Sequence, residues 1–127
     1  MKNGGRLRAI ASTASLQGGA TLAAYSAAKH GVLGLVRSTA KEIAKSEITC
    51  NAICPGFVDT EMAAGAATGV AQKFNIDEAK AMEMIVAANP MKRLIAPEEV
   101  AATALFLASS GAASINGHAL SLSGGEV

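Results

Sequence analysis

The feature of this 127-residue chain that most limits its fold is the alternation of short apolar segments with long helical ones. Residues 7–11 and 48–54 are short and rich in apolar or β-branched side chains, which is typical of buried strands. Between them, residues 23–45 carry an apolar stripe at helical spacing. A strand, a helix and a second strand in this order predict a parallel sheet with helical crossovers, and therefore an α/β fold.

The rest of the chain continues this alternation. Residues 77–88 are predicted to form a helix that begins near Asp77, and residues 97–107 a further helix, because proline suits the first helical position and acidic residues suit the first turn. Residues 119–123 form a last short strand, followed by two glycines. The segment 58–75 is rich in Ala, Gly and Thr and is predicted to be a mobile loop, and residues 13–22 form another loop.

The long helix over residues 23–45 is expected to pack against the sheet through its apolar stripe. Gly31 and Gly34 would each destabilise this helix by about 1 kcal/mol relative to alanine, which predicts that they pack closely against a neighbouring backbone. The predicted stripe consists of Ala24, Ala28, Leu35, Val36, Ala40, Ile43 and Ala44.

The overall charge and hydropathy restrict the partners. A net charge of +1 does not favour nucleic acid or an anionic membrane surface. The sequence has no secretory apolar region behind a basic start, and no apolar run of about 18 residues. We therefore expect one domain over residues 1–127 in a soluble, cytoplasmic protein.

The two cysteines, Cys50 and Cys54, lie in the same predicted strand. At about 3.3 Å per residue their Cα atoms would be roughly 13 Å apart, whereas a disulfide tolerates about 7 Å. We expect free thiols in a reducing compartment. A metal site is not expected, because neither His30 nor His118 has a ligand-like spacing to the cysteines.

Tyr25 and Lys29 are the most chemically informative pair. At positions i and i+4 of a helix they share one face, with Cβ atoms roughly 5–6 Å apart. A nearby ammonium favours the phenolate form, which would let the tyrosine exchange a proton near neutral pH. Taken alone, the pair could equally be two solvated side chains. Ser12, thirteen residues upstream, could supply a hydroxyl that holds a substrate oxygen against the phenol; Ser15 and Gln17 are weaker candidates for substrate contact.

These residues are expected to meet at one edge of the sheet. Ser12 and Pro55-Gly56 follow two predicted strands, and Tyr25 begins the helix between them. In open α/β sheets, ligands bind at the carboxyl ends of the strands. The sequence therefore predicts a proton-transfer site that acts on a carbonyl or alcohol.

The pattern resembles the short-chain dehydrogenase/reductase family over nearly the whole chain. A Tyr-x-x-x-Lys motif alone is weak, but its combination with the upstream serine, the Asn-x-x-x-Pro-Gly strand end and the family's usual ending is specific. The segments that carry the resemblance are Ser12, Tyr25–Lys29, Asn51–Thr60, Pro97–Ala101 and Leu122–Gly125.

The resemblance implies a Rossmann-like, doubly wound three-layer fold and an NAD(P)-dependent interconversion of a secondary alcohol and a ketone, with a hydroxyacyl or cyclic substrate possible. Tyr25 would exchange the proton, Lys29 would stabilise the phenolate and contact the nicotinamide ribose, and Ser12 would polarise the substrate carbonyl. Four further residues would line the nicotinamide pocket: Pro55, Gly56, Val58 and Thr60. Thr60 could instead cap a following helix. Family members are commonly homo-oligomers, so the resemblance implies that this protein is a homo-oligomer as well.

The match covers only the C-terminal half of the family fold. The family's Gly-rich turn, Thr-Gly-x-x-x-Gly-x-Gly, which receives the pyrophosphate, does not occur. The residue that selects NAD or NADP, the Asn-Ala-Gly strand end and the catalytic Asn are also missing. Arg8 interrupts a strand that is usually apolar, so either this strand is an edge or it is distorted.

Three functions therefore remain open from the sequence. The first is an oxidoreductase with a small-molecule alcohol or ketone as substrate. The second is a truncated, inactive fragment that keeps the site but lacks the cofactor-binding half, which the start at Met1 and the charge of Arg8 favour. The third is a non-catalytic interaction module.

Overall fold

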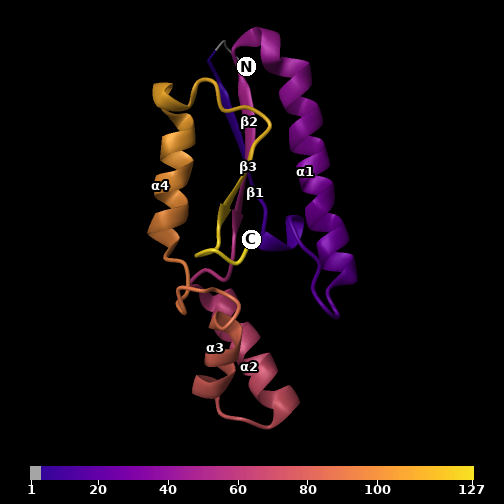
Figure 1. The fold of residues 1–127 in the computed structure, drawn as a ribbon, viewed down its shortest axis with the longest axis vertical. Coiled ribbons are helices and arrows are strands. Elements are labelled where there is room, and N and C mark those ends of the chain that lie inside the picture. The colour runs from indigo at the N-terminus through magenta and orange to yellow at the C-terminus, as the bar shows by residue number, and fades with distance from the viewer. Residues whose placement is uncertain (1–3) are drawn as a thin grey trace.

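Three parallel strands form the centre of the fold in the computed structural model, which describes residues 4–127 (Figure 1). They are β1 (Arg6–Ile10), β2 (Thr49–Pro55) and β3 (Ala119–Leu122), in the sheet order β1-β2-β3. Arg6 pairs with Thr49 at the start of the first ladder, and Pro55 pairs with Leu122 at the end of the second. The predicted α/β fold with a parallel sheet is confirmed.

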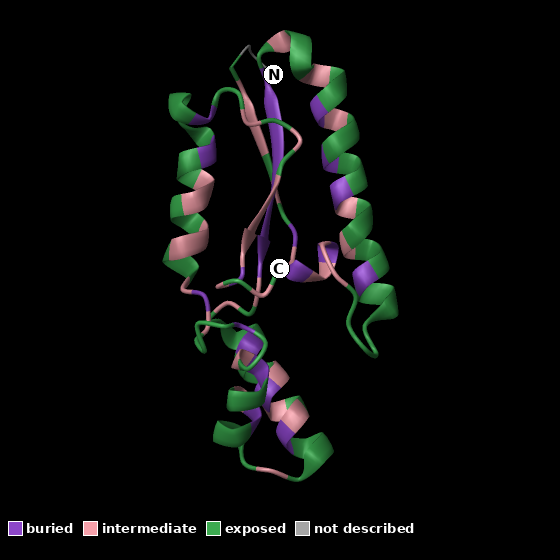
Figure 2. Cartoon of the chain, in the orientation of Figure 1, coloured by how far each residue is buried: buried purple, intermediate pink, exposed green. Residues whose placement is uncertain are grey.

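Helices cover both faces of this sheet. Helix α1 (Ala23–Ile43) lies on one face and α4 (Pro97–Ala108) on the other, which gives three layers (Figure 1). β2 is central and every residue of it is buried (Figure 2). On the α1 side, Leu33 and Val36 pack with Cys50 and Ala52, and on the α4 side Ile53 packs with Leu107.

The predicted apolar stripe of α1 is only partly correct. Val36 and Ala40 are buried, but Leu35 is 68% exposed, and Leu33, which the predicted stripe left out, is buried. Ala24 and Ala28 are exposed as well. The prediction that Gly31 and Gly34 pack closely against a backbone is wrong, because a Cβ at either position would meet no atom within 4 Å. At about 3.6 residues per turn, the exposed residues of the predicted stripe within α1 lie on the side opposite to Leu33, Val36 and Ala40, which face the sheet.

The segment predicted as a mobile loop contains a helix, α2 (Glu61–Phe74), which is followed by α3 (Glu78–Val86). The two helices pack on each other beyond the carboxyl ends of the strands (Figure 1). Asp77 caps α3, as predicted, by accepting a hydrogen bond from the backbone of Lys80. Alanine is the best helix former, and the contact with α3 stabilises a segment whose glycines and threonine suggested a loop. The buried contact consists of Ala67, Ala71, Ala81 and Ile85.

Arg8 is accommodated because β1 is the edge strand of the described sheet. Its side chain is exposed, and Nη1 donates a hydrogen bond of 2.7 Å to the carbonyl oxygen of Ala104 in α4. Of the two expectations for this residue, the edge position is confirmed. The arginine also ties the edge strand to the helix that covers it.

Candidate active site

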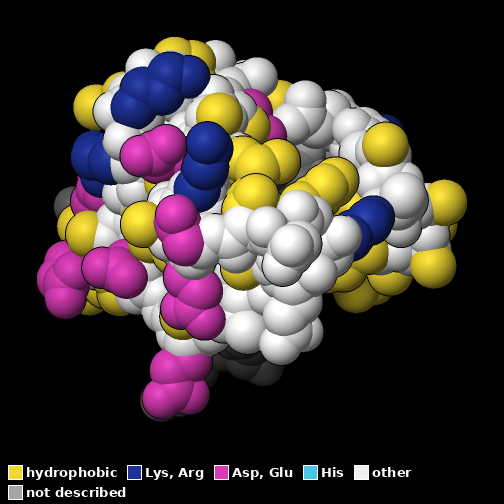
Figure 3. Space-filling model, turned by 90° about the horizontal axis from the view of Figure 1, so that it is seen from below, with side chains coloured by type: hydrophobic (Ala, Val, Ile, Leu, Met, Phe, Trp, Pro, Cys, Tyr) yellow, Lys and Arg dark blue, Asp and Glu magenta, His cyan; other side chains and the backbone are white. Residues whose placement is uncertain are grey.

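A cleft with a volume of ≈ 620 Å³ opens at the carboxyl ends of β1 and β2. Figure 3 views the molecule from this end, where hydrophobic side chains gather and acidic ones lie toward one side. All seven residues that the sequence predicted for the site line the cleft, namely Ser12, Tyr25, Lys29, Pro55, Gly56, Val58 and Thr60. The prediction that these segments converge at one edge of the sheet is therefore met.

Ser12 is placed by the end of β1. The backbone N–H of Ala11 donates a 2.7 Å hydrogen bond to the carbonyl of Ile53, which extends the pairing to β2 up to the serine. The Ser12 side chain then starts a short 3-10 turn over Thr13–Ser15, since its Oγ accepts a 3.1 Å hydrogen bond from the N–H of Ala14. Accepting this bond leaves the hydroxyl hydrogen able to donate to a substrate oxygen.

Tyr25 and Lys29 are placed by the first turns of α1. The Lys29 ammonium lies 5.7 Å from the centroid of the Tyr25 ring, so the predicted pair is in contact. Ser26, which follows Tyr25 in the sequence, is buried. Its backbone N–H donates a hydrogen bond to the carbonyl of Leu22, which orients the start of the helix. Tyr25 is 47% exposed on the cleft side. The phenol is therefore accessible to a small molecule.

The strand end of β2 forms another wall of the cleft. The Gly56 N–H donates a 2.9 Å hydrogen bond to the carbonyl of Leu122, which ties this end to β3. Val58 then forms a parallel bridge with Ile95, so the chain is held until α2 begins. Thr60 occupies the position just before α2, but its Oγ1 donates to the carbonyl of Val58 at 3.3 Å rather than accepting from the helix. Thr60 is thus in the cap position without a side-chain cap bond.

Two polar residues of the cleft, far apart in the sequence, form a hydrogen bond with each other. Nε2 of Gln17 donates a 2.6 Å hydrogen bond to Oε1 of Glu126, and both side chains line the cleft. Gln17 was a weak candidate from the sequence, and Glu126 was missed. Ser15, the other weak candidate, is 1% exposed and does not line the cleft. The paired glycines before Glu126 were the available signal, because they allow the chain to turn back.

The cysteine next to the site is not a candidate nucleophile. Cys54 is fully buried under the cleft, and this burial raises the pKa of its thiol, an effect only partly offset by the Ser12 backbone and Arg37. The reactive form of a cysteine is the thiolate, which burial in apolar surroundings disfavours. Cys50 and Cys54 are both free thiols. They contribute packing rather than chemistry.

The residues in the cleft fit one end of a nicotinamide cofactor. Six residues that line the cleft could hold a planar amide and a ribose, with an ammonium beside a phenol: Tyr25, Lys29, Pro55, Gly56, Val58 and Thr60. Within residues 4–127 no segment has the Thr-Gly-x-x-x-Gly-x-Gly spacing that would cradle a pyrophosphate at a helix N-terminus, and Gly18-Gly19, between β1 and α1, do not have it. The described residues thus offer a site for the reacting end alone.

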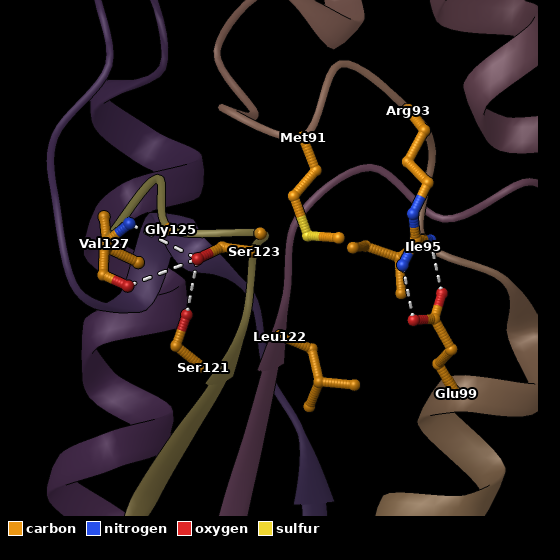
Figure 4. A pocket seen from close by; sticks show the side chains of 10 residues that line it. Met91, Arg93, Ile95, Glu99, Ser121, Leu122, Ser123, Gly125 and Val127 are labelled. Carbon is orange, nitrogen blue, oxygen red and sulfur yellow. Dashed lines mark hydrogen bonds and ion pairs between the residues drawn. The ribbon is translucent and has the colours of Figure 1, made fainter.

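A second, smaller pocket of ≈ 200 Å³ lies beside α4 and is structural in character (Figure 4). Arg93 and Glu99 form a two-bond ion pair in it, with distances of 2.6 and 2.7 Å. The Arg93 guanidinium lowers the pKa of Glu99 from 4.5 to about 2, helped by the N–H of Ala96 that the carboxylate also accepts. This pair fastens the preceding loop to the start of α4.

The geometry and the comparisons agree on the class of protein. A family model described as enoyl-(acyl carrier protein) reductase matches residues 1–126. This chain belongs to the short-chain dehydrogenase/reductase family.

Individual relatives are oxidoreductases. The chain is 39% identical over 125 residues to D-β-hydroxybutyrate dehydrogenase of Rhizobium meliloti, covering 98% of this chain and 48% of that protein. It is 40% identical over 122 residues to acetoacetyl-CoA reductase of the same organism, covering 96% and 46%. A structure of actinorhodin polyketide ketoreductase with NADPH superposes with a TM-score of 0.90 and 39% identity, covering 97% and 48%.

The chain spans about half the length of the curated relatives it matches. The missing glycine-rich turn noted in the sequence is consistent with this coverage. No helix within residues 4–127 is both long enough and apolar enough to cross a membrane.

Proposed function

We propose that this chain carries the proton-transfer site of an NAD(P)-dependent oxidoreductase that interconverts a secondary alcohol and a ketone. The observation that supports this function is the meeting of Ser12, Tyr25 and Lys29 in one cleft with the Pro55-Gly56 strand end. These groups come from three segments, the ends of β1 and β2 and the start of α1, which would not need to share a cleft if each had only a structural role. The substrate class includes hydroxyacyl and cyclic compounds.

In the proposed mechanism, the reacting oxygen of the substrate lies between the Ser12 hydroxyl and the Tyr25 phenol. Ser12 donates a hydrogen bond that polarises the carbonyl, and Tyr25 gives its proton to the oxygen during reduction or accepts it during oxidation. The Lys29 ammonium, 5.7 Å from the ring, stabilises the phenolate left after the transfer.

The cofactor supplies the hydride when it is bound, because no amino-acid side chain can. Lys29 would contact its ribose. The nicotinamide would be held by Pro55, Gly56, Val58 and Thr60, which line the cleft.

The test is turnover of NADH or NADPH with methyl acetoacetate, followed by absorbance. Tyr25→Phe is expected to lower kcat by about 10²–10⁴-fold, the usual contribution of a positioned proton donor. Lys29→Met should lower kcat as well, whereas Lys45→Met, in the 3-10 turn that follows the far end of α1, serves as the matched control. Circular dichroism checks that the variants remain folded. Activity retained in Tyr25→Phe would show that the phenol is not the acid.

A second candidate function is a non-catalytic interaction module, or an inactive fragment, and one feature favours it. Large apolar side chains are exposed beside the edge strand: Ile10 is 55% exposed, and Leu105 and Phe106 on α4 are 72% and 49% exposed. Light scattering with an NADH titration separates the two functions. A folded oligomer that binds no NADH and shows no turnover would favour the interaction module.

A further inference from the structure

The cleft contains a single carboxylate among its described lining residues, that of Glu126. Lys29 is the single cation in the same lining, and it lies against the Tyr25 ring. The remaining walls are largely apolar, with Leu22, Phe57 and Met62 among them. A negative charge in an apolar, half-enclosed cleft is screened less than one on an open surface.

The backbone places this carboxylate in the cleft. Gly124 and Gly125 have φ values of +62° and +96°, so the chain reverses directly after β3. The reversal is held by Ser123, which is buried: its carbonyl accepts from the Glu126 N–H at 3.3 Å, and its Oγ accepts from the Val127 N–H at 3.3 Å. Glu126 is therefore positioned by a fixed turn.

Both carboxylate oxygens are directed by neighbours in the cleft. Oε1 accepts the 2.6 Å hydrogen bond from Gln17. Oε2 faces the Gly56 backbone, since a Cβ built on Gly56 would lie 3.4 Å from it. The charge thus lies between the loop that follows Ser12 and the strand end that the proposed cofactor would contact.

We propose that Glu126 makes this cleft select uncharged carbonyl substrates, such as esterified 3-ketoacyl compounds, over free keto acids or hydroxy acids. A free acid would bring a second carboxylate into the cleft, and the two like charges would repel. This inference rests on the proposed function and narrows its substrate class.

The test compares methyl acetoacetate with acetoacetate, two probes that share the reacting carbonyl and differ in charge. Their affinities for the ¹⁵N-labelled full chain are measured by NMR titration at low salt, without cofactor, following the amides of the cleft. The ester should bind about tenfold more tightly than the acid, which is the size of one partly screened carboxylate–carboxylate repulsion. Glu126→Gln should reduce this ratio to within about threefold, because the amide keeps the shape and loses the charge.

Glu98→Gln is the matched control, since Glu98 is an exposed carboxylate that does not line the cleft, and it should keep the wild-type ratio. Any of four results would overturn the inference: equal affinities of the two probes in the wild type, tighter binding of the acid, an unchanged ratio in Glu126→Gln, or no binding of either probe. Because the titration needs no hydride transfer, it is independent of turnover. A chain that discriminates the probes but never oxidises NADH would keep this inference about the cleft and remove the proposed reductase.

Discussion

Gly124 and Gly125 form the turn that follows β3 and leads to Glu126. Substituting each of them by alanine should lower the stability of the protein by a different amount. A Cβ on Gly124 would collide with the Asn89 carboxamide, coming within 2.7 Å of its Cγ, whereas a Cβ on Gly125 would meet Pro90 at an ordinary 3.6 Å. Both glycines have positive φ, so alanine at either position brings about 1–3 kcal/mol of backbone strain. Gly124→Ala alone must also displace Asn89.

Displacing the buried side chain of Asn89 breaks its two hydrogen bonds. Asn89 is 8% exposed, its Nδ2 donates to the carbonyl of Arg93 at 2.9 Å, and its Oδ1 accepts from the N–H of Met91 at 2.8 Å. Each bond is worth about 0.5–1.5 kcal/mol. Gly124→Ala should therefore lower the free energy of unfolding by about 1–3 kcal/mol more than Gly125→Ala does.

Urea denaturation of the two variants and the wild type, followed by circular dichroism, measures this difference as a change in midpoint at constant slope. Gly125→Ala is the matched control, because it introduces the same methyl group and a similar strain without the collision. Equal destabilisation by the two substitutions would refute the reasoning, since it would mean that Asn89 adapts without loss.

The remaining predictions concern the packing of α4 and the ion pair at its start. Leu107→Ala should cost about 2–4 kcal/mol in a urea titration, because Leu107 is 1% exposed, whereas Leu105→Ala, at 72% exposed, should change stability by less than about 0.5 kcal/mol. The lowered pKa of Glu99 means that its pair with Arg93 adds stability above pH 4.5, and that this stability is lost as the pH falls toward about 2. Stability measured over that range should depend less on pH in Glu99→Gln than in the wild type or in Glu98→Gln; identical profiles would contradict the role of the pair.

Much of the fold and of the candidate site could be predicted because the relevant signals are local. Strands and helices differ in their hydrophobic period, and Tyr25 and Lys29 meet because four residues separate them on one helix. The meeting of Ser12 with Pro55-Gly56 followed from one topological rule, that parallel strands end at the same edge of a sheet. The cost of burying the charge of Arg8 reduced the possibilities for β1 to an edge strand or a distorted one, and the structure shows the edge.

The elements that were predicted wrongly depend on what packs against them. Helix α2 was expected to be a loop, and it is stabilised by α3 through a buried cluster that includes Ala67 and Ile85. Gly31 and Gly34 meet open space rather than a backbone, because they lie on the side of α1 opposite to Leu33 and Val36, which face the sheet. Neither outcome can be read from the spacing of residues within one segment.

The sequence by itself determined the alternation of strands and helices, the pairing of Tyr25 with Lys29 and the serine at the strand end, because period and short-range spacing specify them. Only the tertiary structure decided what else lines the cleft. Gln17 and Glu126 are 109 residues apart and meet through a glycine turn with positive φ. Whether such a turn carries a carboxylate into the cleft or into solvent depends on the packing around Ser123 and Asn89, which no local pattern encodes.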